Sequence, residues 1–483
     1  MKIKLSNYKK FFTFSLGALI WFSFLLFYNL DTLSIRLWDE SRNACNALEM
    51  FCNKQYFIRY FLGKPDFWEL KPPLLLWCNI VCFNIFGINE FAIRLPSVIA
   101  ILAMSIAIIF FLKKYGYDWK TGVLTILILS TLSGFMGEHI ARTGDHDAML
   151  TAFITIASLL FFDLTQNLSR NKIWFMFFLM LLLGWFTKSI AILFFCPAWL
   201  IFLIYDKKIF PFLFKWQLYA GLIGLLSLLA SYYIYRNIAT PGYWQQVWNN
   251  ELFNRFLNKS SNLDYHQYGF FYYISNFKNR IGYWLLLTPI LIWPNRFAKH
   301  KNLEVFLQCC LWITLFLISL GTKNFWYDAI LYPTLALLIA IKTTSFCNYI
   351  MEYHKLRLGL NVLVVVCFLG SFAQIKNNIF FPKDHIYDGA LYNLAYLLRN
   401  KQWTNQQYEI NILYDNIESP IYFYYQKLKK EGKKITFTNH PQQDNLCHQT
   451  YITADTAICA MALKSGYLTT ILPNNCYQLK KTN

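Results

Sequence analysis

The chain has 483 residues, of which 56% are hydrophobic and 19% aromatic, and its formal net charge is +19. Few soluble proteins have this composition, whereas many multi-pass membrane proteins do. The excess of Lys and Arg is typical of cytoplasmic loops and of contact with lipid head groups, and no segment resembles a nucleic-acid-binding module. We therefore expect membrane lipids, and no nucleic acid, as partners.

The first segment predicts an uncleaved membrane anchor. Residues 1–10 carry four Lys, and residues 11–30 contain no charged residue and are long enough to cross a bilayer. A cleaved signal peptide also begins in this way, but no clear small-residue cleavage site follows. We expect the N-terminus to lie in the cytoplasm.

Apolar runs recur along the rest of the chain. They cover residues 72–87, 93–112, 120–136, 148–165, 173–187, 189–204, 216–235, 281–294, 303–320, 326–341 and 359–374. All the basic loops fall on the cytoplasmic side only if 72–87 does not cross the membrane. This run is also short for a span. We therefore predict an all-α membrane domain of eleven spans, within a range of 11 to 13, with 72–87 as a surface helix in a long outer loop over 31–92.

The composition changes after about residue 375. Strand-like runs at 410–414 and 434–438 alternate with a helix-like stretch at 420–428, which predicts a small α/β domain over 375–483 beside a membrane domain over 1–374. An odd number of spans places this domain outside. If it lies in an oxidising compartment, two of Cys447, Cys459 and Cys476 could pair, and the sequence does not choose between them.

Four polar motifs lie in or beside the predicted outer loops. The first contains Asp39, Glu40 and Arg42, and charges beside a membrane need water, a partner or a function. A structural alternative is a helix N-terminus capped by Asp39, followed by an interfacial helix from Glu40 to Phe51. The two interpretations are equally supported by this motif alone.

The second motif, residues 63–74, contains Glu69, Lys71 and two Pro. It is either a turn before an apolar helix or a place where Lys71 holds a lipid phosphate. The third, residues 139–147, contains Arg142, Asp145 and Asp147. Its carboxylates could bind a divalent metal or cap the next helix.

The fourth motif, residues 251–273, contains Arg255, His266 and an aromatic run typical of an interfacial belt. His266 is either a solvated loop residue or a functional one. The predicted topology places Lys188 and Lys323 on the same outer face as these motifs.

In order and spacing, the motifs resemble the family of bacterial aminoarabinose (lipid A) transferases and their relatives among the protein mannosyltransferases. The resemblance covers roughly residues 20–340. The matching residues are Trp38 to Arg42, Lys71 to Leu74, Phe86 to Phe91, Arg94 to Ser97, Ala141 to Thr143, Asp147, Thr187, Lys188, Arg255, Phe256, His266, Tyr272, Tyr273, Lys323, Trp326, Tyr327 and Pro333.

This resemblance implies the C-type membrane glycosyltransferase fold and the inverting transfer of a sugar from a polyprenyl-phosphate donor, such as undecaprenyl phosphate. The acceptor would be lipid A, another glycan or a protein, at the periplasmic side of the inner membrane. Asp39 matches the residue proposed as base, and Asp147 the family's second acidic position, with Glu40 beside the base. Arg42 and Lys71 match the phosphate-binding residues.

His266 matches a histidine that helps to hold a metal in some relatives, so a divalent ion (Mg²⁺, Mn²⁺ or Zn²⁺) is a candidate cofactor. In the aminoarabinose transferases a Glu directly precedes Lys-Pro-Pro, whereas here that position is Leu70 and the Glu is Glu69. The resemblance therefore does not carry over a metal site of Glu69 with His266, nor aminoarabinose as the sugar.

The proposed chemistry also suits the residue types themselves. A lipid phosphate is a good leaving group, so the reaction needs a base for the acceptor hydroxyl and cations for the departing phosphate, among which Lys188 is a candidate. Further candidates are Arg142, Asp145, Arg255, Lys323 and Tyr327. The alternative function is a transporter or flippase for a lipid-linked sugar, although transporters place ionisable residues near mid-bilayer and often contain internal repeats.

Overall fold

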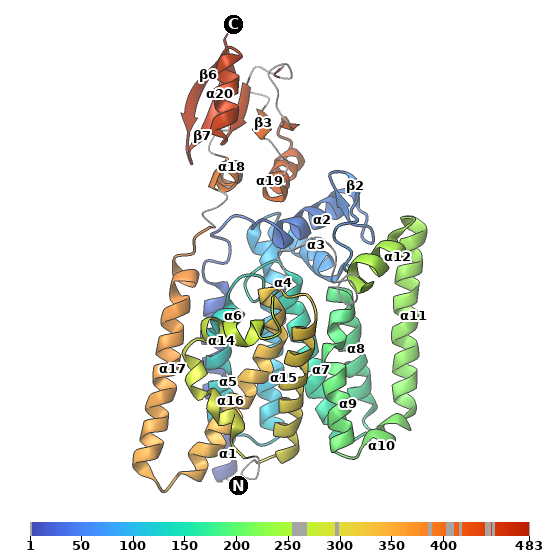
Figure 1. Cartoon of the computed structure of the whole chain (residues 1–483), viewed down its shortest axis with the longest axis vertical. Helices are drawn as coiled ribbons and strands as arrows, with labels where there is room; N and C mark the ends of the chain where they lie inside the picture. Colours follow the sequence, from blue (N-terminus) through green and yellow to red (C-terminus); the bar gives the residue numbers. More distant parts are fainter. Residues whose placement is uncertain are drawn as a thin grey trace. The chain divides into compact units, whose positions relative to one another are not determined.

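The computed structural model of the chain divides into two compact units (Figure 1). It describes residues 2–253, 268–294, 299–384, 389–401, 410–414, 418–439, 446 and 450–482. Unit 1 comprises residues 1–28, 70–75 and 94–381, and unit 2 comprises residues 29–69, 76–93 and 382–483.

Unit 1 is built from helices. In chain order they are α1 (Lys2–Phe27), α4 (Glu90–Lys114), α5 (Trp119–Thr131), α6 (Ser133–Met136), α7 (His146–Gln166), α8 (Asn171–Lys188), η1 (Ser189–Phe195), α9 (Cys196–Tyr205), α10 (Ile209–Leu213), α11 (Trp216–Ala239), α12 (Tyr243–Gln246), η2 (Val247–Phe253), α14 (Tyr272–Ile281), η4 (Gly282–Ile292), α15 (Lys301–Leu320), η6 (Phe325–Leu331), α16 (Tyr332–Tyr349) and α17 (His354–Phe380). The first four residues of α4 belong to unit 2.

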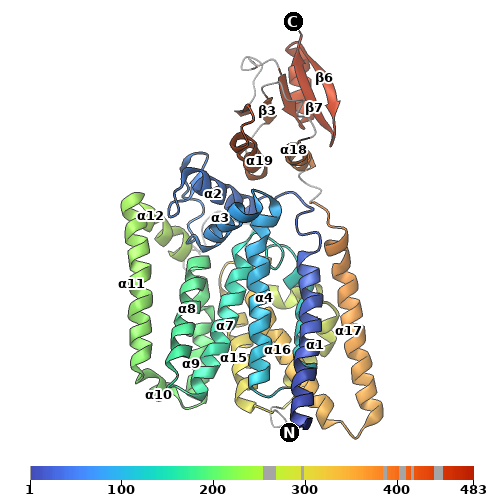
Figure 2. The same ribbon diagram turned by 180° about the vertical axis from the view of Figure 1, so that it is seen from behind.

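Within the described part of the chain, eight helical stretches are long and apolar enough to cross a membrane. Their burial separates the centre of the bundle from its periphery. The span of α7 is 83% buried, whereas those of α11 and α17 are only 11% and 17% buried, and Figure 2 shows both helices at the edges of the bundle. Because apolar side chains on such helices have no protein to cover them, they suit a lipid environment. The chain is therefore a multi-pass membrane protein.

Every predicted apolar run lies on a helix, which confirms the helical membrane domain. The described residues give eight candidate spans by length, because α8, η1 and α9 follow one another without a gap and count as one stretch, and because α5 has 13 residues and η4 has 11. The run predicted as a surface helix is α3 (Leu74–Phe86), which with 13 residues is also short for a span. Its place at the membrane surface, like the count of eleven spans, stays a prediction.

Unit 2 joins the segment after α1 to the C-terminal residues. Besides most of α3, it contains α2 (Asp39–Asn53), β1 (Tyr60–Phe61), β2 (Lys64–Pro65), α18 (Gly389–Asn400), β3 (Ile410–Tyr414), α19 (Ser419–Lys430), β4 (Ile435–Asn439), β5 (Thr450–Thr453), α20 (Thr456–Lys464), β6 (Tyr467–Leu472) and β7 (Cys476–Lys481). Helix α19 packs against α2 (Figure 1).

The C-terminal sheet confirms the predicted α/β composition. Its five strands have the order β4-β3-β5-β7-β6, with β3 parallel to both β4 and β5, and the remaining pairs antiparallel. The predicted strands and helix of this region correspond to β3, β4 and α19. Cys459 and Cys476 are both buried free thiols, and Cys447 lies outside the described residues. The predicted domain boundary at residue 375 stays a prediction.

Candidate active site

The described candidate residues form two groups, one in each unit. Unit 1 holds Lys71, Arg142, Asp145, Asp147, Lys188, Lys323 and Tyr327, and unit 2 holds Asp39, Glu40, Arg42 and Glu69. Arg255 and His266 lie outside the described residues. The predicted metal pairing of His266 with Glu69 therefore stays a prediction.

A buried ion pair between Asp147 and Lys188 is the centre of the group in unit 1. Lys188 Nζ donates to both carboxylate oxygens of Asp147, at 2.6 and 2.7 Å, and the two side chains are 8% and 6% exposed. Asp147 stands in the first turn of α7, where the helix dipole favours an acid. Lys188 ends α8, and Ser189 follows with a φ of 50°.

The chain turns sharply after Lys188 because a glycine leaves room for the return. A Cβ on Gly184 would lie 2.3 Å from Ile192 Cδ1, so no larger residue fits where η1 packs against α8. The apolar sequence from α8 to α9 is therefore interrupted at Lys188, where α8 ends and η1 begins. The ammonium group is thereby presented at a helix end rather than on a helix face.

The ion pair forms part of the wall of a pocket in unit 1. The remaining wall is mainly apolar, with Ile190 and Phe194 from η1 and Ile318 from α15. The ring of Tyr327 also lines the pocket, and Lys188 Nζ lies 4.9 Å from the ring centroid. A cation over an aromatic ring at this distance is stabilised by the ring quadrupole. The pocket thus combines an apolar wall with a charged corner.

The short helix η6 carries Tyr327 and is fixed by a second buried ion pair. Asp328, the next residue, accepts two hydrogen bonds from the Arg280 guanidinium at 2.6 Å each, and one from the Tyr332 hydroxyl at 2.7 Å. Asp328 is fully buried. Just before η6, Lys323 donates to the Gly321 carbonyl at 3.1 Å. Lys323 therefore lies in the same connection as the pocket residues Gly321 and Tyr327.

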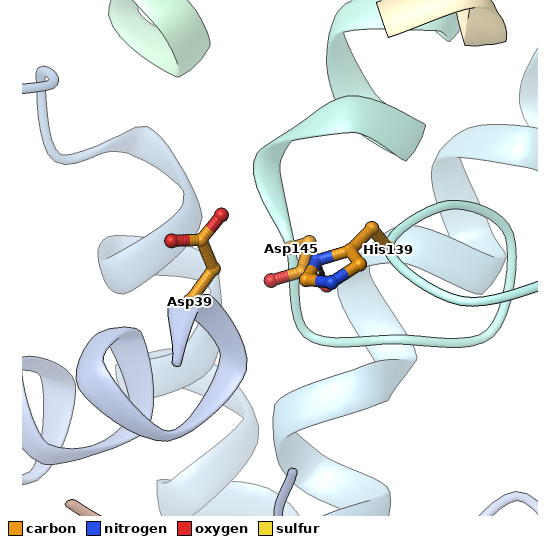
Figure 3. Close-up of side chains that lie close together, drawn as sticks. All are labelled: Asp39, His139 and Asp145. Carbon is orange, nitrogen blue, oxygen red and sulfur yellow. Dashed lines mark ion pairs between the residues drawn. The ribbon is translucent and has the colours of Figure 1, made fainter. Parts of the chain in front are cut away.

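His139 and Asp145 supply a nitrogen and an oxygen that could bind a metal. His139 Nδ1 lies 3.2 Å from Asp145 Oδ2, and Figure 3 shows the two side chains facing one another; it also labels Asp39, the first residue of α2. The His139 ring stacks on Trp326 of η6, with centroids 4.1 Å apart. Asp145 occupies the N-cap position of α7 but its side chain makes no capping bond. The capping alternative is therefore wrong for Asp145.

Arg142 and Lys71 are two further cations of unit 1. Arg142 donates to the Tyr28 carbonyl. Lys71 is 8% exposed, and the carbonyl of the preceding Leu70 accepts a hydrogen bond of 2.8 Å from the Tyr243 hydroxyl. Leu70 also packs against Tyr243 in a small apolar cluster. Leu70 thus serves as an apolar anchor for the backbone beside Lys71.

In unit 2 the first motif forms the start of α2, as predicted, but Asp39 does not cap it. Asp39 is the first helical residue and is partly exposed, and Trp38 occupies the cap position with a φ of 77°. The Glu40 side chain, which is 1% exposed, instead accepts a hydrogen bond of 2.8 Å from the Arg36 N–H. The physical reason is that the N–H groups that a capping Asp39 would serve already have backbone partners: Ser41 N–H donates to the Arg36 carbonyl and Arg42 N–H to the Trp38 carbonyl, both at 3.0 Å.

Arg42 has a partner that sequence reasoning missed. Its guanidinium donates to both oxygens of Asp66, at 2.9 and 2.7 Å, and Asn46 donates a third bond of 3.0 Å. Burial alone would raise the pKa of Asp66, but the hydrogen bonds and charge of Arg42, with Asn46, outweigh it and lower that pKa. Asp66 stands within the second motif, so its presence there was the available signal.

The Arg42 guanidinium also lies 3.4 Å from the centroid of the Phe61 ring. Phe61 belongs to the β1–β2 hairpin, whose two-residue turn has a positive φ at Leu62 and Gly63. Arg42 is therefore held in a fixed orientation between a ring and a carboxylate. The Arg42 side chain is 23% exposed, so part of it still reaches solvent.

Comparisons with known proteins agree with this arrangement. The sequence model of the dolichyl-phosphate-mannose-protein mannosyltransferase family matches residues 70–235. An undecaprenyl phosphate-alpha-4-amino-4-deoxy-L-arabinose arabinosyl transferase of Aeromonas salmonicida is 27% identical over 66% of this chain, and one of Photorhabdus laumondii is 26% identical over 76% of it. The matched segments span 58% and 65% of the length of these two relatives.

Solved structures show the same fold at low sequence identity. The structure of ArnT from Cupriavidus metallidurans bound to undecaprenyl phosphate superposes with a TM-score of 0.68 at 12% identity, covering 97% of both chains. The oligosaccharyltransferase of Archaeoglobus fulgidus, tethered with an acceptor peptide, has a TM-score of 0.53 at 12% identity and covers 98% of this chain and 74% of that one. The resemblance inferred from the sequence is confirmed: this chain is a membrane protein similar to the aminoarabinose transferases and related to the protein mannosyltransferases, with the C-type glycosyltransferase fold.

Proposed function

We propose that this chain transfers a sugar from a polyprenyl-phosphate donor to a hydroxyl group of a lipid, glycan or protein acceptor. The observation that carries the proposal is the pocket of unit 1, where an apolar wall meets the buried pair of Asp147 and Lys188. An isoprenoid phosphate has the same two parts, an apolar chain and a charged head. The similarity to transferases named for undecaprenyl-phosphate-linked aminoarabinose supports this donor class.

The reaction is a single displacement with inversion. The acceptor oxygen forms a bond to the anomeric carbon as the bond from that carbon to the phosphate oxygen breaks. The hydroxyl proton passes to a base, for which Asp39 is our candidate, and the polyprenyl phosphate leaves with its charge. The partly exposed carboxylate of Asp39 is a modest base, so orientation of the acceptor must supply much of the rate.

Cations stabilise the phosphate as it departs. Arg42, Lys71 and Lys188 are the candidates for this role, and Arg42, whose Nε and one Nη bind Asp66, has further N–H groups that suit phosphate oxygens. A divalent ion would add Lewis-acid stabilisation of the same phosphate, and His139 with Asp145 is a donor pair for it in unit 1. We place this chemistry on the periplasmic side of a bacterial inner membrane, because the basic loops predict that topology.

The test uses purified protein in proteoliposomes with a panel of radiolabelled polyprenyl-phosphate sugars and a cell-envelope extract. Transfer of label to an acceptor, lost in the Lys188→Met variant, is the expected result. A matched control is Lys342→Met, which breaks another buried pair in unit 1, that of Lys342 with Glu304 at 3.2 Å. Movement of the donor across sealed vesicles without any new glycosidic bond would overturn the proposal in favour of transport.

A further inference from the structure

The segment that leads into Asp39 has its backbone donors satisfied by side chains. In this irregular stretch, Ser34 and Ile35 are fully buried. A buried N–H group without a partner is costly, so each must find an acceptor. The N–H groups of Ser34, Ile35 and Leu37 donate to three tyrosine hydroxyls at 3.2, 3.1 and 3.2 Å, and that of Arg36 donates to Glu40.

All three tyrosines come from the C-terminal part of unit 2. Tyr392 and Tyr396 are one turn apart on α18, and Tyr424 is on α19. Two of the hydroxyls are oriented by carboxylates, since Tyr396 donates to Asp384 at 2.6 Å and Tyr424 donates to the buried Glu90 at 2.5 Å. Because those hydroxyl protons are committed to the carboxylates, the oxygen lone pairs are directed to the backbone.

The same region contacts the segment through Arg399. Its guanidinium forms an ion pair of 2.9 Å with Glu90 and donates to the Thr32 carbonyl at 2.7 Å. Carbonyl and N–H groups between Thr32 and Leu37 are thus bound by residues more than 350 positions later in the chain. Local hydrogen bonding alone would not define this path.

A second series of contacts runs from α19 to Arg42. The Tyr422 hydroxyl donates to Glu49 at 2.7 Å, and the other Glu49 oxygen accepts from the Gly63 N–H at 3.1 Å. The Tyr422 ring meets Phe61 edge to face, with centroids 5.3 Å apart, and Phe61 is the ring beneath Arg42. Tyr422 therefore braces the hairpin that orients the guanidinium.

We propose that α18 and α19 form a positioning element for the catalytic segment, in which Tyr392, Tyr396 and Tyr424 fix the approach to Asp39, and Tyr422 fixes Arg42. This inference rests on the proposed function. The C-terminal region then contributes to the rate of the chemical step itself, besides any contact with an acceptor. The tyrosines act only through Asp39 and Arg42.

The test replaces tyrosine by phenylalanine in the full-length protein, which removes the hydroxyl group and keeps the ring. The triple variant Tyr392→Phe, Tyr396→Phe and Tyr424→Phe should lower kcat by about 10²-fold with little change in the donor KM, because a misplaced base slows turnover more than binding. Tyr422→Phe should instead raise the donor KM. The control is Tyr425→Phe on α19, which keeps the ring that packs on Tyr422 and Phe437, and its kinetics should stay unchanged.

Hydrogen exchange gives a readout that needs no activity. The amides of Ser34, Ile35 and Leu37 should exchange faster in the triple variant and stay protected in Tyr425→Phe, while peptides of α7 exchange alike in both. Unchanged exchange and kcat in the triple variant would overturn the proposal, and so would an equal rise in every peptide, which indicates general unfolding. If the unsubstituted protein transfers no sugar while these amides respond as expected, the proposed function fails and the positioning of the segment stands.

Discussion

Lys188 Nζ lies within 2.7 Å of both carboxylate oxygens of Asp147, in a corner of a mainly apolar pocket. In this corner of the pocket, the carboxylate of Asp147 and the ammonium group of Lys188 compensate each other's charge. A ligand phosphate that approached Lys188 would have to share it with Asp147. The pair is therefore a site where binding and charge compensation are coupled.

Breaking this pair should separate stability from activity. Lys188→Met leaves the buried Asp147 charge without its ammonium partner, which costs about 3–5 kcal/mol in typical buried pairs. The double variant Asp147→Asn, Lys188→Met removes both charges and should recover most of the thermal stability without recovering transfer. Thermal unfolding in detergent, measured beside the radiolabel assay, checks both; recovered transfer in the double variant would remove the pair from the mechanism.

Asp39→Asn should abolish transfer with little effect on stability. Loss of a general base typically lowers the rate by about 10²–10⁴-fold. Asp39 is only partly buried, so the melting temperature should hardly change. Asp31→Asn, at an exposed position of the same segment, is the matched control and should keep full activity. An active Asp39→Asn enzyme would exclude Asp39 as the base.

The pair of Arg42 and Asp66 predicts a particular dependence of stability on pH. The folded protein lowers the pKa of Asp66 below its ordinary value of 3.8, so the ionised carboxylate stabilises the fold above that pH. This contribution is lost as the pH falls through the lowered pKa. Asp66→Asn should thus destabilise the protein most near neutral pH, and the difference from the unsubstituted protein should shrink below about pH 3.8. Chemical unfolding across the pH range measures it; a constant difference would contradict the assignment.

The pair of His139 and Asp145 predicts sensitivity to chelators. If their nitrogen and oxygen ligands hold a catalytic ion, EDTA should stop transfer and Mn²⁺ should restore it. His139→Gln should then need more Mn²⁺ for half of the maximal rate. His300→Gln is the control, since this histidine is engaged elsewhere, with Nε2 2.7 Å from the Tyr115 carbonyl. Full activity in EDTA would show that the reaction needs no removable metal.

Asp328→Asn should loosen η6 and with it Tyr327. The substitution leaves the buried Arg280 facing an uncharged amide, and the loss of a charge-assisted pair costs about 3–5 kcal/mol. Glu304→Gln, which weakens the buried pair with Lys342, provides the comparison. Both variants should melt earlier, but only Asp328→Asn should raise the donor KM. An equal KM in the two variants would assign Asp328 a purely structural role.

Sequence patterns predicted the helices and strands better than they predicted which residues contact one another. The helix at α2, the strands β3 and β4, and the helix at α19 follow from local periodicity, and all are present. The partnership of Arg42 with Asp66, 24 positions apart, needs a hairpin that places one beside the other. His139 and Trp326 lie much farther apart in sequence, and only the packing of η6 brings their rings into contact.

Loop charge and the length of the apolar runs did not predict how long each helix is. They predicted a span at the runs over 120–136 and 281–294, but the first run is divided between α5 and α6 and the second contains the 11-residue η4. The residue that caps a helix was harder still to predict from the sequence. Asp39 looked like a cap because it precedes an amphipathic helix, yet the helix begins at Asp39 itself, and the N–H groups of Ser41 and Arg42 donate to the carbonyls of Arg36 and Trp38, which sequence spacing does not reveal.

Trp38 holds a backbone conformation that suits glycine, with a φ of 77° and a ψ of −124°, while the residue is 70% exposed. A side chain in this region of φ and ψ costs about 1–3 kcal/mol. Exposure means that packing returns little of that cost. On grounds of stability alone glycine would be favoured at position 38, so the chain stores backbone strain directly before Asp39, the candidate base.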